Sequence, residues 1–64
     1  MSNTTLEKYI LAVLTTNPNR VTGGVPIFVF QSKEEIQEKI GMFESILGGM
    51  GHQLDHEIYL VVRH

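Results

Sequence analysis

Four consecutive apolar residues at positions 27–30, Ile-Phe-Val-Phe, constrain the fold more than any other feature of the sequence. An unbroken run of β-forming residues is apolar on both faces, which is typical of a strand that is covered on both sides. The chain has 64 residues and no cysteine, so disulfides cannot stabilise it. A chain of this size buries only about 60% of its extended surface on folding. We therefore expect a homodimer, in which a second copy completes the sheet or the helix layer.

Two stretches carry helical periodicity. Over residues 4–16, Thr4 and Glu7 form a capping-box pattern and Pro18 ends the helix. The apolar stripe of this first helix consists of Leu6, Tyr9, Ile10, Val13 and Leu14. Over residues 33–48, Ser32 caps the start, with Glu35 three positions on, and Gly48 ends the helix. Its stripe is Ile36, Ile40, Phe43 and Leu47, widened by Met42 and Ile46.

The remaining segments predict strands. Residues 20–30 read as a strand or as a hairpin turning at Gly23 and Gly24. Residues 54–63 read as a strand, because apolar residues alternate along 57–63. The order helix, strand, helix, strand predicts a small two-layer α/β domain, bordering on α+β, that spans residues 1–64. The second helix and its flanking strands would form a βαβ unit with parallel strands.

The glycine- and histidine-rich stretch at residues 48–56 is the first candidate site. Phosphate-binding glycine loops follow a strand and open a helix, whereas Gly48, Gly49 and Gly51 follow a helix. They are better explained as the helix cap and the turn into the next strand. His52, Asp55 and His56 form a candidate metal site if it is doubled across a dimer axis, but zinc needs three or four ligands. We expect no cofactor.

Two groups of residues suggest contacts with protein. The second helix carries an acidic face that could match a basic patch on a partner, formed by Glu34, Glu35, Glu38 and Glu44. The candidates for the dimer interface are apolar or aromatic: Leu11, Phe28, Phe30, Tyr59 and Val61.

The composition narrows the class of function. Five basic residues against seven acidic ones give a net charge of −2, which offers no surface for binding nucleic acid. No apolar run reaches the roughly 20 residues needed to cross a bilayer, so we expect a cytoplasmic protein without membrane contact. No catalytic motif occurs, and a chain this small rarely encloses an active-site pocket. The sequence favours a small non-catalytic inhibitor or adaptor that binds a larger protein, such as a phage-type antagonist of a host system. The alternative is a small-ligand or metal-binding module with its site at the dimer interface.

Overall fold

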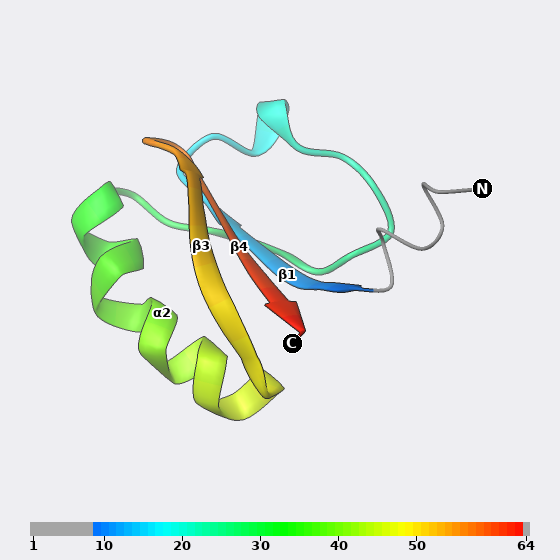
Figure 1. Cartoon of the computed structure of the whole chain (residues 1–64). Helices are drawn as coiled ribbons and strands as arrows, with labels where there is room; N and C mark the ends of the chain where they lie inside the picture. Colours follow the sequence, from blue (N-terminus) through cyan, green and yellow to red (C-terminus); the bar gives the residue numbers. More distant parts are fainter. Residues whose placement is uncertain (1–8, 64) are drawn as a thin grey trace.

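The computed structural model describes residues 9–63, which form a compact mixed α+β fold (Figure 1). Within this range the structure has one α-helix and one four-stranded sheet. In chain order the elements are β1 (Ile10–Thr15), the 3-10 helix η1 (Pro18–Arg20), β2 (Ile27–Val29), α2 (Lys33–Leu47), β3 (Gly49–Asp55) and β4 (Ile58–Arg63).

The strands lie in the order β2-β1-β4-β3. β1 pairs with β2 in parallel and with β4 antiparallel, and β3 pairs antiparallel with β4. β2 and β3 therefore run in the same direction at opposite edges of the sheet. Helix α2 connects these two edges and lies against one face of the sheet (Figure 1).

Helix α2 begins and ends where its capping residues require. The Ser32 hydroxyl oxygen accepts a hydrogen bond from the Glu35 backbone N–H at 3.2 Å. Gly48 adopts the left-handed conformation, with φ at 71°, and its N–H donates to the carbonyl oxygen of Glu44. The predicted helix at 33–48 is confirmed to within one residue.

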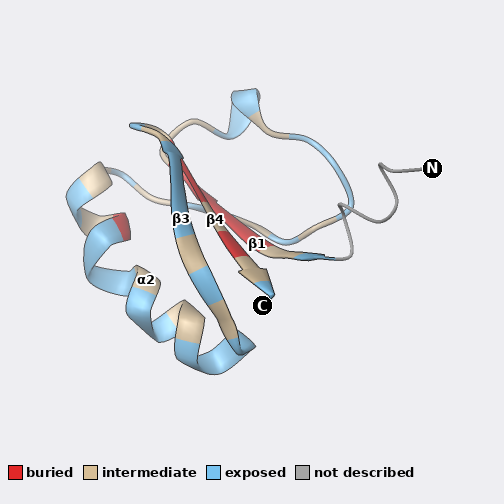
Figure 2. Ribbon diagram, viewed as in Figure 1, coloured by how far each residue is buried: buried red, intermediate tan, exposed pale blue. Residues whose placement is uncertain are grey.

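The core lies between α2 and the two central strands (Figure 2). Ile36 of the helix is fully buried against Ala12 and Leu14 of β1 and against Tyr59 and Val61 of β4. Partly buried side chains close its margins: Leu11, Phe30, Ile40 and Phe43.

The helix predicted at 4–16 is wrong over its second half, because residues 10–15 form strand β1. Residues 4–8 lie outside the described part of the chain. β1 is a central strand, and Ala12, Val13, Leu14 and Thr15 are buried on it in succession. A strand that is covered on both faces has no alternation of apolar and polar residues. The apolar residues of β1 therefore also fitted the spacing expected for a helix, which explains the wrong prediction.

The expected strand pairing is wrong as well. Residues 21–26 contain no strand, so there is no hairpin at Gly23 and Gly24, and β2 covers only residues 27–29 of the predicted 20–30. The predicted strand 54–63 is divided, since β3 ends at Asp55 and β4 begins at Ile58 after a two-residue turn. The predicted βαβ unit requires β2 and β4 to be parallel. Because β1 is parallel to β2 and antiparallel to β4, β2 and β4 run in opposite directions, and the predicted pairing does not form.

Of the glycines predicted to form the helix cap and turn, Gly48 is the cap, whereas Gly49 and Gly51 lie in strand β3. An added Cβ on Gly49 would lie 2.5 Å from the carbonyl oxygen of Val62. On Gly51 it would lie 2.5 Å from the Cδ1 atom of Ile40 in the helix. These two positions lack side chains because neighbouring atoms already occupy that space, and this allows α2 to lie close to β3.

Candidate protein-contact surface

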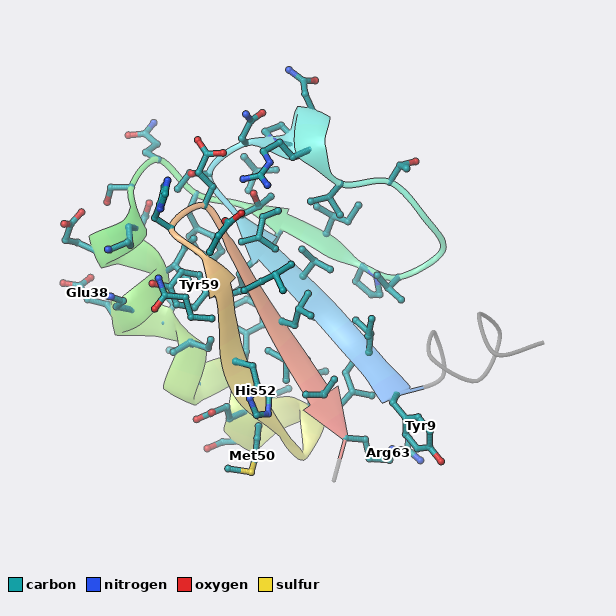
Figure 3. All side chains as sticks on the ribbon, turned by 45° about the horizontal axis from the view of Figure 1, so that its top comes forward. Tyr9, Glu38, Met50, His52, Tyr59 and Arg63 are labelled. Atoms are coloured by element: carbon teal, nitrogen blue, oxygen red, sulfur yellow. The ribbon has the colours of Figure 1, made fainter. Side chains whose placement is uncertain are left out.

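One side of α2 combines acidic and apolar side chains. Glu34, Glu38, Met42 and Ile46 follow one another at intervals of four residues, which aligns them along one side of the helix. All four are exposed, Met42 by 55% and Ile46 by 74%. Glu38 projects from α2 away from the sheet (Figure 3). These four residues are called the α2 row.

The other two glutamates of the predicted acidic face have contacts within the fold. A carboxylate oxygen of Glu35 accepts a hydrogen bond from the Gln31 backbone N–H at 3.1 Å. Glu44 Oε2 accepts one from the Gly51 backbone N–H at 2.6 Å. Both side chains are part-buried, so Glu34 and Glu38 form the exposed part of the predicted surface.

The structure divides the five residues proposed for a dimer interface. Tyr59 and Val61 are core residues rather than interface residues, and the Tyr59 hydroxyl accepts a hydrogen bond from Gln37 Nε2 at 3.2 Å. Leu11 and Phe30 pack against the same core. Phe28 is 40% exposed and has an edge-to-face contact with Phe43, the ring centroids being 4.8 Å apart. Of the five, Phe28 retains the most surface for a partner.

The candidate metal ligands do not form a cluster. Asp55 Oδ1 accepts the backbone N–H groups of Glu57 and Ile58 at 2.8 and 3.1 Å, and so closes the β3–β4 turn. Its Oδ2 lies 2.8 Å from Arg20 Nη2. Within residues 9–63 of one chain, no three His, Asp or Glu side chains come together as a metal site, so a site at His52, Asp55 and His56 that a second chain completes stays a prediction. Within one chain, Asp55 stabilises the β3–β4 turn.

No pattern in the sequence predicts the ion pairs of Arg20. Arg20 Nη1 also contacts Glu57 Oε1 at 3.1 Å, so one guanidinium bridges two carboxylates of the β3–β4 turn. The Glu57 N–H hydrogen bond, together with the Arg20 guanidinium, lowers the pKa of Asp55 below its ordinary value. These two ion pairs connect the end of η1 to the turn between β3 and β4.

The exposure of Met42 and Ile46 does not follow from the apolar stripe that they widen, because such a stripe usually faces the core. Their four-residue spacing from Glu34 and Glu38 is the signal that would have placed them on the acidic side. Helix α2 is neither long enough nor apolar enough to cross a membrane, and no other helix in the described residues is.

The comparisons identify the family. Residues 7–64 match the family described as "Capping complex subunit for YIEGIA". The chain is also 42% identical over 59 residues to the Bacillus subtilis (strain 168) protein named "Uncharacterized protein YpzH", with 92% of each chain covered. No solved structure matches it. The chain therefore belongs to the family of capping complex subunits for YIEGIA.

Proposed function

We propose that this chain is a non-catalytic subunit that binds the YIEGIA protein named in its family's description, and that it does so in the cytoplasm. The family membership supports a role in a protein complex. The observation that carries the proposal is the α2 row, which joins two exposed carboxylates to two exposed apolar side chains on one helix.

The α2 row has the character of a protein contact. Exposed side chains as large as Met42 and Ile46 gain about 25 cal/mol for each Å² of apolar surface that a partner covers. Glu38 and Glu34, about one and two helical turns before Met42, would attract a partner with basic residues beside an apolar centre. Charged groups at the edge of a contact act mainly on the rate of association and on specificity.

An inhibitory role follows if the subunit covers a surface that its partner uses for something else. In that case, binding through α2 would exclude other ligands of the partner without any chemical step. This is the adaptor or inhibitor role expected from the sequence, with the YIEGIA protein in place of an unspecified host protein.

Titration of the purified chain against the purified YIEGIA protein of the same organism tests the proposal. We expect Ile46→Ser to weaken binding at least tenfold, since one well-placed apolar contact is worth more than about 1.4 kcal/mol. Tyr9→Ser is the control, because Tyr9 is 51% exposed just before β1, outside both the α2 row and β2. Absence of binding by the unaltered chain would reject the function. Equal binding by Ile46→Ser would reject the α2 row as the surface.

We also propose that the chain forms a homodimer through β2. This strand is an outer strand of the sheet, and Phe28 and Val29 on it are 40% and 56% exposed. Edge strands with exposed apolar residues readily pair with another chain. Sedimentation at micromolar concentration should give about twice the 7.2 kDa of one chain, and a species of 7.2 kDa at every concentration would reject the dimer.

A further inference from the structure

We propose that Met42 on α2 is a site of reversible oxidation by hydroperoxides, and that its conversion to the sulfoxide weakens binding of the protein partner. The inference rests on the proposed function, because Met42 belongs to the α2 row. It adds to that function a modification that regulates the same surface.

Methionine is the one sulfur-containing residue type in this chain. The sequence has three methionines, at positions 1, 42 and 50, and no cysteine. A chain without a thiol has no thiolate for a peroxide to oxidise, so the methionine thioethers are its oxidisable sulfur groups. Met1 lies outside the described residues. Met42 and Met50 are 55% and 51% exposed, so a small oxidant in solution reaches both side chains.

The place of Met42 on the helix decides what oxidation changes. Helix α2 packs against the core through Ile36, Ile40 and Phe43, which lie on the other side of the helix from Met42. The neighbours of Met42 four positions away are Glu38 and Ile46, and both are exposed. An oxygen atom added to Met42 therefore changes the middle of the α2 row and leaves the core as it is.

Met50 provides an internal control on a separate surface. Gly51 faces the helix, because an added Cβ there would meet Ile40, so Met50 beside it on β3 faces away from α2. Figure 3 shows Met50 projecting from β3. The two methionines thus have similar exposure, and one of them lies outside the α2 row.

The oxidation is a two-electron transfer of one oxygen atom. The Sδ atom of Met42 attacks the terminal oxygen of the hydroperoxide, an S–O bond forms, and the O–O bond breaks. The hydroperoxide proton moves to the departing oxygen, which leaves as an alcohol, or as water when the oxidant is hydrogen peroxide. A methionine sulfoxide reductase reverses the change with a dithiol, which becomes a disulfide while the oxygen leaves as water.

The sulfoxide is poorly suited to the contact that the α2 row would form. Its oxygen is a polar acceptor, and covering it with apolar surface is unfavourable unless a donor meets it. The adjacent Glu38 carboxylate also only accepts hydrogen bonds, so it cannot satisfy that oxygen. We expect the sulfoxide to weaken binding about tenfold, the same effect as Ile46→Ser. By the same linkage, a bound partner should slow the oxidation of Met42.

Peroxide treatment without a partner tests the chemistry. In Met50→Leu, hydrogen peroxide should convert Met42 to the sulfoxide, as located by mass spectrometry of peptides. The circular dichroism spectrum should stay that of the untreated chain. A Met42 that resists peroxide while Met50 of the unaltered chain reacts, or an oxidised chain that loses its helix, would overturn the proposal.

Binding to the purified YIEGIA protein of the same organism tests the consequence, after the peroxide has been removed. Oxidised Met50→Leu should bind about tenfold more weakly than before treatment, and the reductase with a dithiol should restore its binding. Oxidised Met42→Leu should bind as before, because leucine keeps a similar apolar volume without sulfur. Equal weakening in both variants, or in neither, would overturn the proposal.

Protection by the partner provides a second readout on the unaltered chain. With the YIEGIA protein in excess, peroxide should oxidise Met42 more slowly and Met50 at an unchanged rate. Equal rates at Met42 with and without a bound partner would overturn the proposal and leave the proposed function in place. An untreated chain that does not bind the YIEGIA protein would reject that function and this inference together.

Discussion

Glu44 of α2 accepts a hydrogen bond from the backbone N–H of Gly51 on β3 at 2.6 Å. β3 is an outer strand of the sheet, so an N–H directed away from β4 would otherwise be available to another chain. The helix therefore holds its neighbouring strand through one side chain and closes part of an exposed sheet edge. A glutamate that the sequence assigned to a partner has a role within the fold.

Replacing Glu44 should destabilise the protein. We expect Glu44→Ala to lower the free energy of unfolding by about 1–3 kcal/mol, the usual cost of losing a hydrogen bond to a charged group. Urea denaturation followed by circular dichroism measures the change. Glu38→Ala is the control, since Glu38 is exposed on the same helix and should change stability by less than about 0.5 kcal/mol. Equal losses in both variants would mean that the bond to Gly51 does not stabilise the sheet.

Gly49 and Gly41 should respond in opposite directions to substitution by alanine. A Cβ on Gly49 would collide with the Val62 carbonyl, a backbone atom that cannot move aside, so Gly49→Ala should cost about 1–3 kcal/mol. At Gly41 in α2 a Cβ meets nothing within 4 Å, so Gly41→Ala should stabilise the helix by up to about 1 kcal/mol. Thermal melting of the two variants compares them directly. A stabilising Gly49→Ala would show that β3 is not packed as described.

Helix α2 was predictable because its signals are local. Ser32 and Gly48 mark its ends, and Ile36, Ile40 and Phe43 repeat at helical spacing between them. The strands were harder. β1 is buried on both faces, so it has no alternating pattern, and β3 contains two glycines because other parts of the chain fill their side-chain space. In both strands, tertiary packing outweighed the local preference.

The candidate surface was partly predictable for the same reason. Glu34 and Glu38 were found because an acidic run on a helix is visible in the sequence. The hydrogen bond of Glu44 and the ion pair of Asp55 depend on contacts made only after folding, with Gly51 on another element and with Arg20, 35 positions earlier in the chain. No local spacing reports such contacts. The exposure of Met42 and Ile46 likewise depends on which side of α2 meets the sheet.

The ion pair between Asp55 and Arg20 should make stability depend on pH. The pKa of Asp55 is lower in the folded protein than in the unfolded chain. The charged carboxylate therefore stabilises the fold at pH values above the pKa of the unfolded chain, and this stabilisation is lost as the pH falls through the pKa of the folded protein. Asp55→Asn keeps an oxygen for the turn hydrogen bonds but loses the charge. Its melting temperature should be below that of the unaltered protein at pH 7, and the gap should close below about pH 4. If the difference in melting temperature between the two proteins stayed constant from pH 7 to below pH 4, the charge of Asp55 could not be its cause.

The most direct test of the α2 row is charge reversal at Glu34 and Glu38, measured as the dissociation constant for the purified YIEGIA protein at low and moderate salt. The account predicts that the unaltered chain binds, that E34K/E38K stays folded by circular dichroism but binds more weakly at low salt, and that added salt reduces the difference. Binding by E34K/E38K that equals binding by the unaltered chain at both salt concentrations would contradict it.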